Sequence, residues 1–109
     1  MKLPGADHLV VDERKVREYL LSSSHPIGRF KAAAFARVGF DAQNWRQFIS
    51  AIRNLALRGD AVPSEPGMYG VKYLISGTII GPSGKLEVTT VWLIPTEGGA
   101  PRLVTVYPR

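Results

Sequence analysis

The chain has no cysteine, only two histidines and no long apolar run. Without cysteine it can form no disulfide, no thiol nucleophile and no thiolate-bound metal centre. The histidines, His8 and His25, lie far apart without carboxylates at metal-ligand spacing. The nine acidic residues are scattered, which disfavours a carboxylate-bound magnesium ion. The sequence therefore predicts no metal site and no cofactor, and it favours metal-independent chemistry.

Signals for membranes and export are missing too. No stretch approaches the roughly 20 apolar residues of a membrane span. Pro4, Gly5 and Asp7 come too early for the basic-then-apolar pattern of a signal peptide. We therefore expect a cytoplasmic chain with no membrane partner. Its 109 residues suffice for a single domain, 1–109, with its own core, but not for two.

Positive charge is what the chain has in excess. Fourteen Lys and Arg residues stand against nine Asp and Glu, which gives a net charge of +5. In a small domain this balance favours polyanionic partners, either nucleic acid or an acidic protein. Charge alone does not choose between them, because many basic proteins bind no nucleic acid.

The half of the chain from about 9 to 59 predicts helices. Asp12 can cap a first helix, which the serines at 22–24 end. A second, alanine-rich helix runs from Arg29 or Phe30 to about residue 38, and Gly39 stops it. A third begins at Asp41. The residues predicted on buried helix faces are Val16, Tyr19 and Leu20 in the first helix, and Trp45, Phe48, Ile49, Ile52, Leu55 and Ala56 in the third.

The half from about 68 to 108 predicts strands. Residues 69–80 and 85–94 are rich in β-branched and aromatic side chains, and Gly81-Pro82-Ser83-Gly84 joins them as a hairpin turn. A last strand spans 102–107, and the segment 61–67 is expected to be a loop. The hairpin register pairs Tyr73 with Trp92, Ile75 with Thr90 and Ile79 with Leu86 on an apolar face, and Ser76 with Thr89 and Thr78 with Glu87 on a polar face.

The fold class that follows is α+β, with two to three N-terminal helices packed on one face of a small antiparallel meander. We expect the helices on the apolar face. The register of the last hairpin stays open, so the sequence does not place Thr90 and Thr105 on a common face.

The run from His25 to Lys31 holds the best candidates for chemistry. It combines an imidazole with the cations Arg29 and Lys31, and Pro26 and Gly28 interrupt the helix there. A titratable imidazole beside cations on a turn suits chemistry on a phosphodiester. From residue types alone, the simpler interpretation is a helix–helix connection with a capping histidine and solvated cations.

Resemblance to a known family extends this interpretation. The pattern comprises Lys15-Val16, Tyr19-Leu20-Leu21, His25-Pro26, Gly28-Arg29, Lys31-Ala32, Phe35, Gly39-Phe40 and Trp45, then Tyr73, Gly77, Gly81-Pro82-Ser83-Gly84, Thr90-Val91-Trp92 and Pro101-Arg102-Leu103-Val104-Thr105. It resembles a family of small bacterial proteins whose first half also occurs at the C-termini of contact-dependent inhibition toxins. Those toxin tips are similar to the barnase–EndoU–colicin–RelE-like ribonuclease group. The resemblance implies a toxin-like, metal-independent endoribonuclease.

The chemistry implied is attack of a ribose 2′-hydroxyl on the adjacent phosphate. It needs a group that takes the 2′ proton, a group that protonates the leaving oxygen, and cations for the phosphorane. The catalytic candidates are His25, as base or acid, with Lys31, Arg29, Lys15, Thr90 and Thr105. The candidates for RNA binding are Arg29, Lys31, Arg102 and Tyr107. A surface role for Lys15, and a structural one for Thr90 and Thr105, stay open. Trp92 can stack a base, but it lies on the predicted core face.

The partners implied are RNA, with tRNA and mRNA as candidates, and an acidic antitoxin or immunity protein. The alternative is a non-catalytic basic module that binds RNA or an acidic protein. A third hypothesis is an inactive remnant that pairs with a protein encoded nearby. A catalytic role requires that His25 and a cation meet in one place, whereas binding requires only a basic surface.

Overall fold

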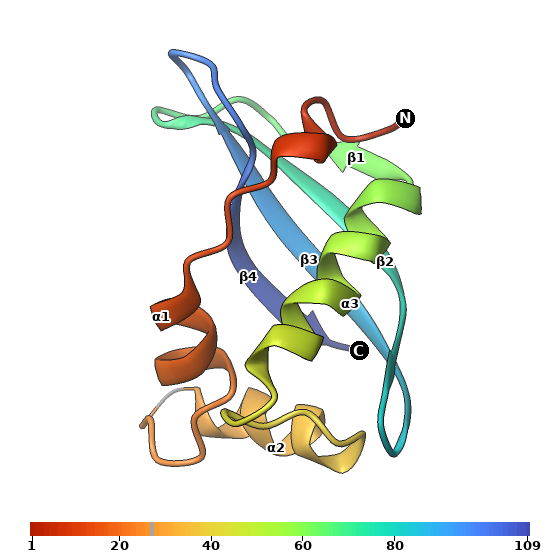
Figure 1. Ribbon diagram of the computed structural model, residues 1–109. Helices are drawn as coiled ribbons and strands as arrows, with labels where there is room; N and C mark the ends of the chain where they lie inside the picture. The colour runs from red at the N-terminus through yellow and green to blue at the C-terminus, as the bar shows by residue number, and fades with distance from the viewer. Residues whose placement is uncertain (27) are drawn as a thin grey trace.

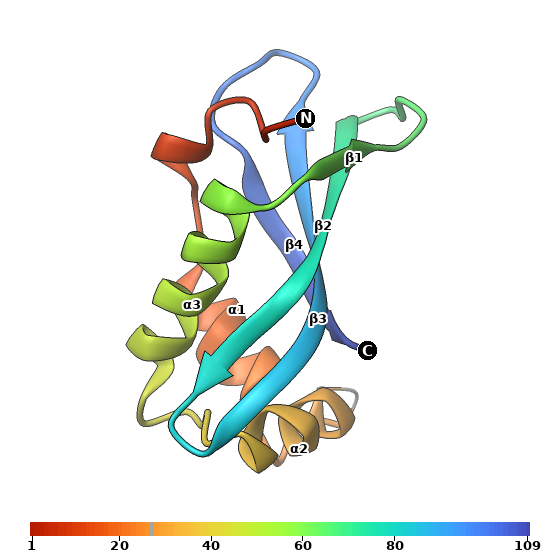
Figure 2. The same cartoon turned by 90° about the vertical axis from the view of Figure 1, so that its right-hand side faces the viewer.

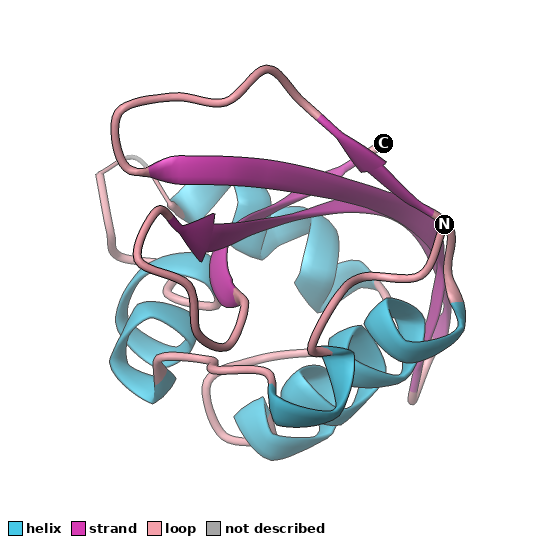
Figure 3. Cartoon of the chain, turned by 90° about the horizontal axis from the view of Figure 1, so that it is seen from above, coloured by secondary structure: helices cyan, strands magenta, loops and turns pink. Residues whose placement is uncertain are grey.

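The computed structural model describes residues 1–26 and 28–109, and Ile27, within the His25–Lys31 run, lies outside the described residues. The fold is α+β, with the helices before a four-stranded antiparallel meander of order β1-β2-β3-β4. Helices α1 and α3 cover one face of this sheet, and α2 lies below the lower end of β4 (Figure 1). Seen from above, the sheet forms one layer and the helices another (Figure 3).

The first helical segment differs from the regular helix that the sequence predicts. Asp12 caps it as expected, since its carboxylate accepts hydrogen bonds from the backbone N–H groups of Arg14 and Lys15. Only Glu13–Lys15 (α1) is α-helical, after a short 3-10 turn at Ala6–His8. Val16–Leu20 forms a π-helical turn, in which the Leu21 N–H donates to the Val16 carbonyl. The predicted inward residues Val16 and Leu20 are fully buried.

Helix α2 (Arg29–Arg37) has the predicted bounds within a residue, and Gly39 follows it with φ +94°. Helix α3 (Trp45–Arg58) begins later than the predicted start at Asp41. The Asp41 carboxylate instead accepts from the backbone N–H groups of Gln43 and Asn44, while the Asn44 side chain accepts from Asp41 N–H. These local bonds compete with helical ones and delay the helix.

The buried face of α3 is the one that the sequence predicts. Phe48, Ile52, Leu55 and Ala56 are buried, while Trp45 and Ile49 are partly buried against the same core. Large apolar side chains of this kind contribute about 1.5–3 kcal/mol each when fully buried. They hold α3 against β2, and this packing fixes the helical layer on one side of the sheet.

The sheet contains one strand that the sequence does not predict. β1 (Ala61–Pro63) pairs with Tyr73–Ile75 of β2 (Gly70–Gly81), in the segment predicted as a loop. A three-residue edge strand tolerates Pro63, because its missing N–H would point to solvent. β3 (Gly84–Pro95) pairs with β2 in the predicted register, for example Ile75 with Thr90.

The last hairpin has a β-bulge. β4 (Arg102–Pro108) pairs Val91 with Thr105 and Trp92 with Leu103, which leaves Val104 as the extra residue. Thr90 pairs with Val106, so Thr90 and Thr105 point to opposite faces. The face with Thr90 and Trp92 carries the helices, as predicted. We call the other side the outer face; it presents Ser76, Thr89, Val91, Thr105 and Tyr107.

Candidate functional site

Lys31 links the start of α2 to the outer face at the edge of β4. Its ammonium Nζ donates a 2.7 Å hydrogen bond to Thr105 Oγ1. The same Nζ lies 4.3 Å from the ring centroid of Tyr107 and 5.4 Å from that of Tyr19. The faces of aromatic rings attract an ammonium group at such distances. The Lys31 ammonium is therefore fixed in position by one hydroxyl and two aromatic rings.

His25 lies next to this cation through Tyr19. The imidazole and the Tyr19 ring meet edge to face, with centroids 4.8 Å apart and planes at 88°. His25 Nδ1 accepts a 3.0 Å hydrogen bond from the backbone N–H of Gly28, just before α2. In the neutral imidazole the hydrogen must then sit on Nε2, since an accepting nitrogen carries none.

Lys15 reaches the same strand from α1. Its Nζ donates a 2.9 Å hydrogen bond to the carbonyl of Val104, the extra residue of the bulge. Both this bond and the one from Lys31 are partly buried. An ammonium has three donors, so Lys15 can bond to the Val104 carbonyl and to an anion at the same time. The structure thus brings His25, Lys31, Lys15 and Thr105 together at β4, and we call these four residues the β4-edge cluster.

In the part of the chain that the structure describes, no carboxylate forms an ion pair with Lys15 or Lys31. Among the described residues, the ion pairs join Met1 with Asp60, His8 with Asp7, Arg14 with Glu18, and Arg17 with Glu13. None of these pairs involves Lys15 or Lys31. The described residues also contain no group of three His, Asp or Glu side chains placed to hold a metal ion.

The outer face continues from the cluster as a polar surface. Ser76 and Thr89 share a 2.8 Å hydrogen bond, and Thr89 pairs with Tyr107, which is 50% exposed. The strand positions of this face also carry the exposed cations Lys72, Lys85 and Arg102 and the exposed acid Glu87, which accepts from Thr78. Figure 2 shows α1 and α3 on the opposite side of the sheet.

Thr90 and Trp92 do not join the cluster. Both are fully buried in the core. Thr90 Oγ1 donates to the carbonyl of Ile75 and accepts from Trp92 Nε1 at 2.9 Å. The Thr90 hydroxyl therefore satisfies a buried indole, which is the structural role that the sequence left open. Trp92 is buried, as its predicted face requires.

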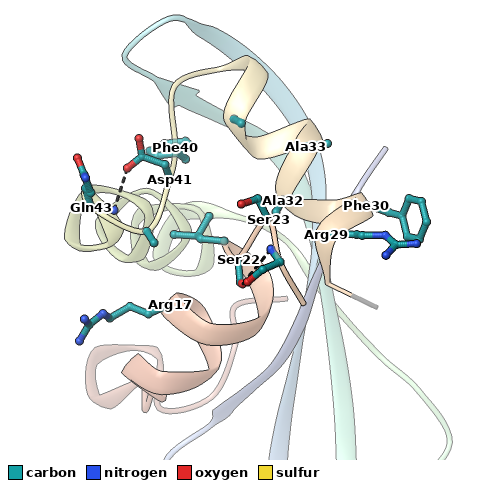
Figure 4. Close-up of a pocket in the computed structure, with 14 residues that line it drawn as sticks. Arg17, Ser22, Ser23, Arg29, Phe30, Ala32, Ala33, Phe40, Asp41 and Gln43 are labelled. Atoms are coloured by element: carbon teal, nitrogen blue, oxygen red, sulfur yellow. Dashed lines mark hydrogen bonds between the residues drawn. The ribbon is translucent and has the colours of Figure 1, made fainter. Parts of the chain in front are cut away.

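Arg29 and Arg102 lie apart from the cluster as well. Arg102 pairs with Leu93, beyond the bulge on β4. Arg29 stacks on the ring of Phe30, with its guanidinium carbon 4.8 Å from the centroid. Arg29 and Phe30 line a cavity of about 890 Å³ between the end of the π-helical turn, α2 and the loop to α3. In Figure 4 their side chains point away from Asp41 and Gln43 on the opposite wall.

Sequence reasoning missed two features of the site. Tyr19 was predicted as a core residue only, yet its ring contacts both His25 and Lys31. The Val104 carbonyl is not a candidate from the sequence, because the bulge that presents it depends on the register of the last hairpin, which the sequence leaves open. Spacing along the chain could reveal neither, since both arise from packing of a helix against a distant strand.

Comparison with solved structures shows that the fold occurs elsewhere. One similar chain belongs to a structure described as a contact-dependent growth inhibition toxin–immunity protein complex from Klebsiella pneumoniae 342. The TM-score is 0.68, with 22% sequence identity over 92% of this chain and 99% of that chain. At this identity the likeness establishes a common fold.

Comparison with sequences gives one family. A family model described as a domain of unknown function, DUF6883, matches residues 2–109. Among curated proteins, none matches the sequence. No helix in the described part of the chain has the length and apolar character to cross a bilayer.

Proposed function

The chain belongs to the DUF6883 family, and we propose that it is a toxin-like, metal-independent endoribonuclease neutralised by a cognate immunity protein or antitoxin. The observation that carries this proposal is the β4-edge cluster. In it, Tyr19 contacts both the His25 imidazole and the Lys31 ammonium, Lys31 bonds to the Thr105 hydroxyl, and Lys15 bonds to the carbonyl of the neighbouring Val104. The fold shared with a chain of a toxin–immunity protein complex supports the toxin-type role.

The two lysines suit the charge of the reaction. Attack of a 2′-hydroxyl on the adjacent phosphate concentrates negative charge on the phosphorane oxygens, and fixed cations stabilise that charge. Lys31 is held by Thr105 and two tyrosine rings, and Lys15 by the Val104 carbonyl. Because both ammonium groups are already positioned, neither must be reorganised when the charge develops.

His25 supplies the imidazole of the site. With Nδ1 bonded to the Gly28 N–H, the neutral ring offers Nε2–H as a donor to a phosphate oxygen or to the leaving 5′ oxygen. Proton uptake by this ring requires that the Gly28 bond open, because the incoming proton would occupy Nδ1. We therefore assign His25 to hydrogen bonding at the phosphate, and to proton transfer once that bond is released.

The outer face suits an RNA strand that leads into the cluster. Its hydroxyls at Ser76, Thr89 and Thr105 can bond to phosphate and ribose oxygens. The half-exposed Tyr107 ring can stack a base next to Lys31. The excess of positive charge along this face, and over the whole chain, favours a polyanion. We expect the reaction to take place in the cytoplasm, where its RNA substrate is found.

The second candidate function is a non-catalytic basic module that binds RNA or an acidic protein. The bond from Gly28 N–H to His25 Nδ1 favours it, since a capping histidine needs no catalytic role. The two proposals differ in product. Incubation of the purified protein with a 5′-labelled single-stranded RNA separates them, because an enzyme yields fragments and a binding module yields only a shifted complex.

A matched variant separates the loss of the imidazole from the loss of the hydrogen bond to Gly28. His25→Asn keeps an acceptor for the Gly28 N–H, because the amide oxygen takes the position of Nδ1, but it has no imidazole. Cleavage by the wild type that is lost in His25→Asn supports the enzyme. Equal RNA binding by both proteins without cleavage supports the binding module instead.

A further inference from the structure

Tyr19 is the residue that connects the imidazole to the cation. Its ring lies edge to face with His25 at 4.8 Å, and its centroid is 5.4 Å from Lys31 Nζ. His25 precedes α2, Lys31 lies in its first turn, and Tyr19 lies in the π-helical turn before them. One aromatic ring therefore contacts both the His25 imidazole and the Lys31 ammonium.

The backbone of Tyr19 constrains the same site. A Cβ added to Gly28 would lie 2.1 Å from the Tyr19 carbonyl oxygen and 3.1 Å from Cδ1 of the Tyr19 ring. Such a contact is too short for any side chain, so only glycine allows the two segments to lie this close. Gly28 is also the residue whose N–H bonds to His25 Nδ1. Contact with Tyr19 thus sets the position of the donor that orients the imidazole.

The local structure around Tyr19 is unusual. The turn Val16–Leu20 is π-helical, with the Leu21 N–H bonded to the Val16 carbonyl at 2.9 Å. Turns of this type are rare and occur frequently at functional sites. The flanking residues Val16 and Leu20 are fully buried, which anchors the turn, while Tyr19 is partly buried against the core and extends to the cluster.

From these contacts we infer that Tyr19 is the positioning residue of the proposed ribonuclease site. Its ring fixes the orientation of the His25 imidazole and holds the Lys31 ammonium beside it. This inference rests on the proposed function for its catalytic meaning. Its structural content, the orientation of His25 by the aromatic ring, can be measured without any RNA.

The test compares Tyr19→Phe, which keeps the ring, with Tyr19→Leu, which removes it. Tyr73→Leu is the matched control, because Tyr73 is also a tyrosine partly buried against the core but lies on β2 opposite Trp92. Long-range ¹⁵N–¹H spectra of the free protein at pH 8 report the tautomer of His25. The exposed His8 serves as an internal reference.

The wild type, Tyr19→Phe and Tyr73→Leu should show His25 as a single Nε2–H tautomer, whereas Tyr19→Leu should show a mixture. In RNA cleavage, Tyr19→Leu should lower kcat by about 100-fold with little change in KM, as expected for a displacement of about 1 Å in a catalytic group. Tyr19→Phe should retain nearly full kcat.

Two results would overturn the inference. One is a Tyr19→Leu protein that keeps the wild-type His25 spectrum. The other is a Tyr19→Phe protein whose kcat falls as far as that of Tyr19→Leu. In that case the Tyr19 hydroxyl, and not its ring, would position the catalytic groups. If the wild type cleaves no RNA, the ribonuclease proposal fails, while the His25 spectra still decide the role of Tyr19.

Discussion

Lys31 and Thr105 are 74 positions apart in the sequence, yet Lys31 Nζ donates a 2.7 Å hydrogen bond to Thr105 Oγ1. The bond joins the first turn of α2 to the outer face of β4. It brings a cation from the helical half of the chain to hydroxyl groups in the strand half. The β4-edge cluster exists because of this junction, and the predictions below concern it.

The first prediction concerns His25. His25→Ala removes the acceptor for the Gly28 N–H, and one such hydrogen bond contributes about 0.5–1.5 kcal/mol. The melting temperature should therefore fall by several degrees, at roughly 4–8 °C per kcal/mol. His25→Asn should melt close to the wild type. Both variants should lose RNA cleavage. An Asn variant with wild-type cleavage would remove His25 from the proposed mechanism.

The second prediction separates Lys31 from Arg29. If Lys31 contacts a phosphate, Lys31→Ala should reduce the slope of log affinity against log salt by about 0.7 for single-stranded RNA. Arg29→Ala should leave the slope unchanged, since Arg29 stacks on Phe30 outside the cluster. Titrations at four or more salt concentrations measure both slopes. Equal slopes for the wild type and Lys31→Ala would contradict the phosphate contact.

The third prediction concerns the two neighbouring threonines of β3. Thr90→Val leaves the buried Trp92 Nε1–H without its acceptor, which costs about 1–3 kcal/mol. Thermal melts should show a fall of at least about 4 °C. Thr89→Val, on the outer face, should stay within about 0.5 kcal/mol of the wild type, as surface changes do. The structural role of Thr90 would be wrong if the two variants melted alike.

Most of the fold could be predicted from local patterns. The buried face of α3 and the register of the β2–β3 hairpin follow from apolar periodicity and from one short turn. The start of α3 at Trp45 and the strand β1 could not. The start of α3 depends on hydrogen bonds between Asp41 and Asn44. Strand β1 depends on pairing with β2, whereas its own sequence, with Pro63, favours a loop.

The site could be predicted only in part. His25, Lys31, Lys15 and Thr105 were recognised as candidates from residue type and from the resemblance, and the structure brings them together. The exclusion of Thr90 and the inclusion of Tyr19 required the β4 bulge and the π-helical turn. Both are local departures from regular structure, and a repeating pattern carries no information about them.

The proposed metal-independent ribonuclease activity is tested most directly by the product of its reaction. A 5′-labelled RNA should be cleaved by the purified protein in excess EDTA as fast as in its absence, because the proposed groups are the imidazole of His25 and the ammonium groups of Lys15 and Lys31. Internal attack of the 2′-hydroxyl should leave a 2′,3′-cyclic phosphate on the upstream fragment. Cleavage that stops with EDTA, or fragments that begin with a 5′-phosphate, would contradict the account.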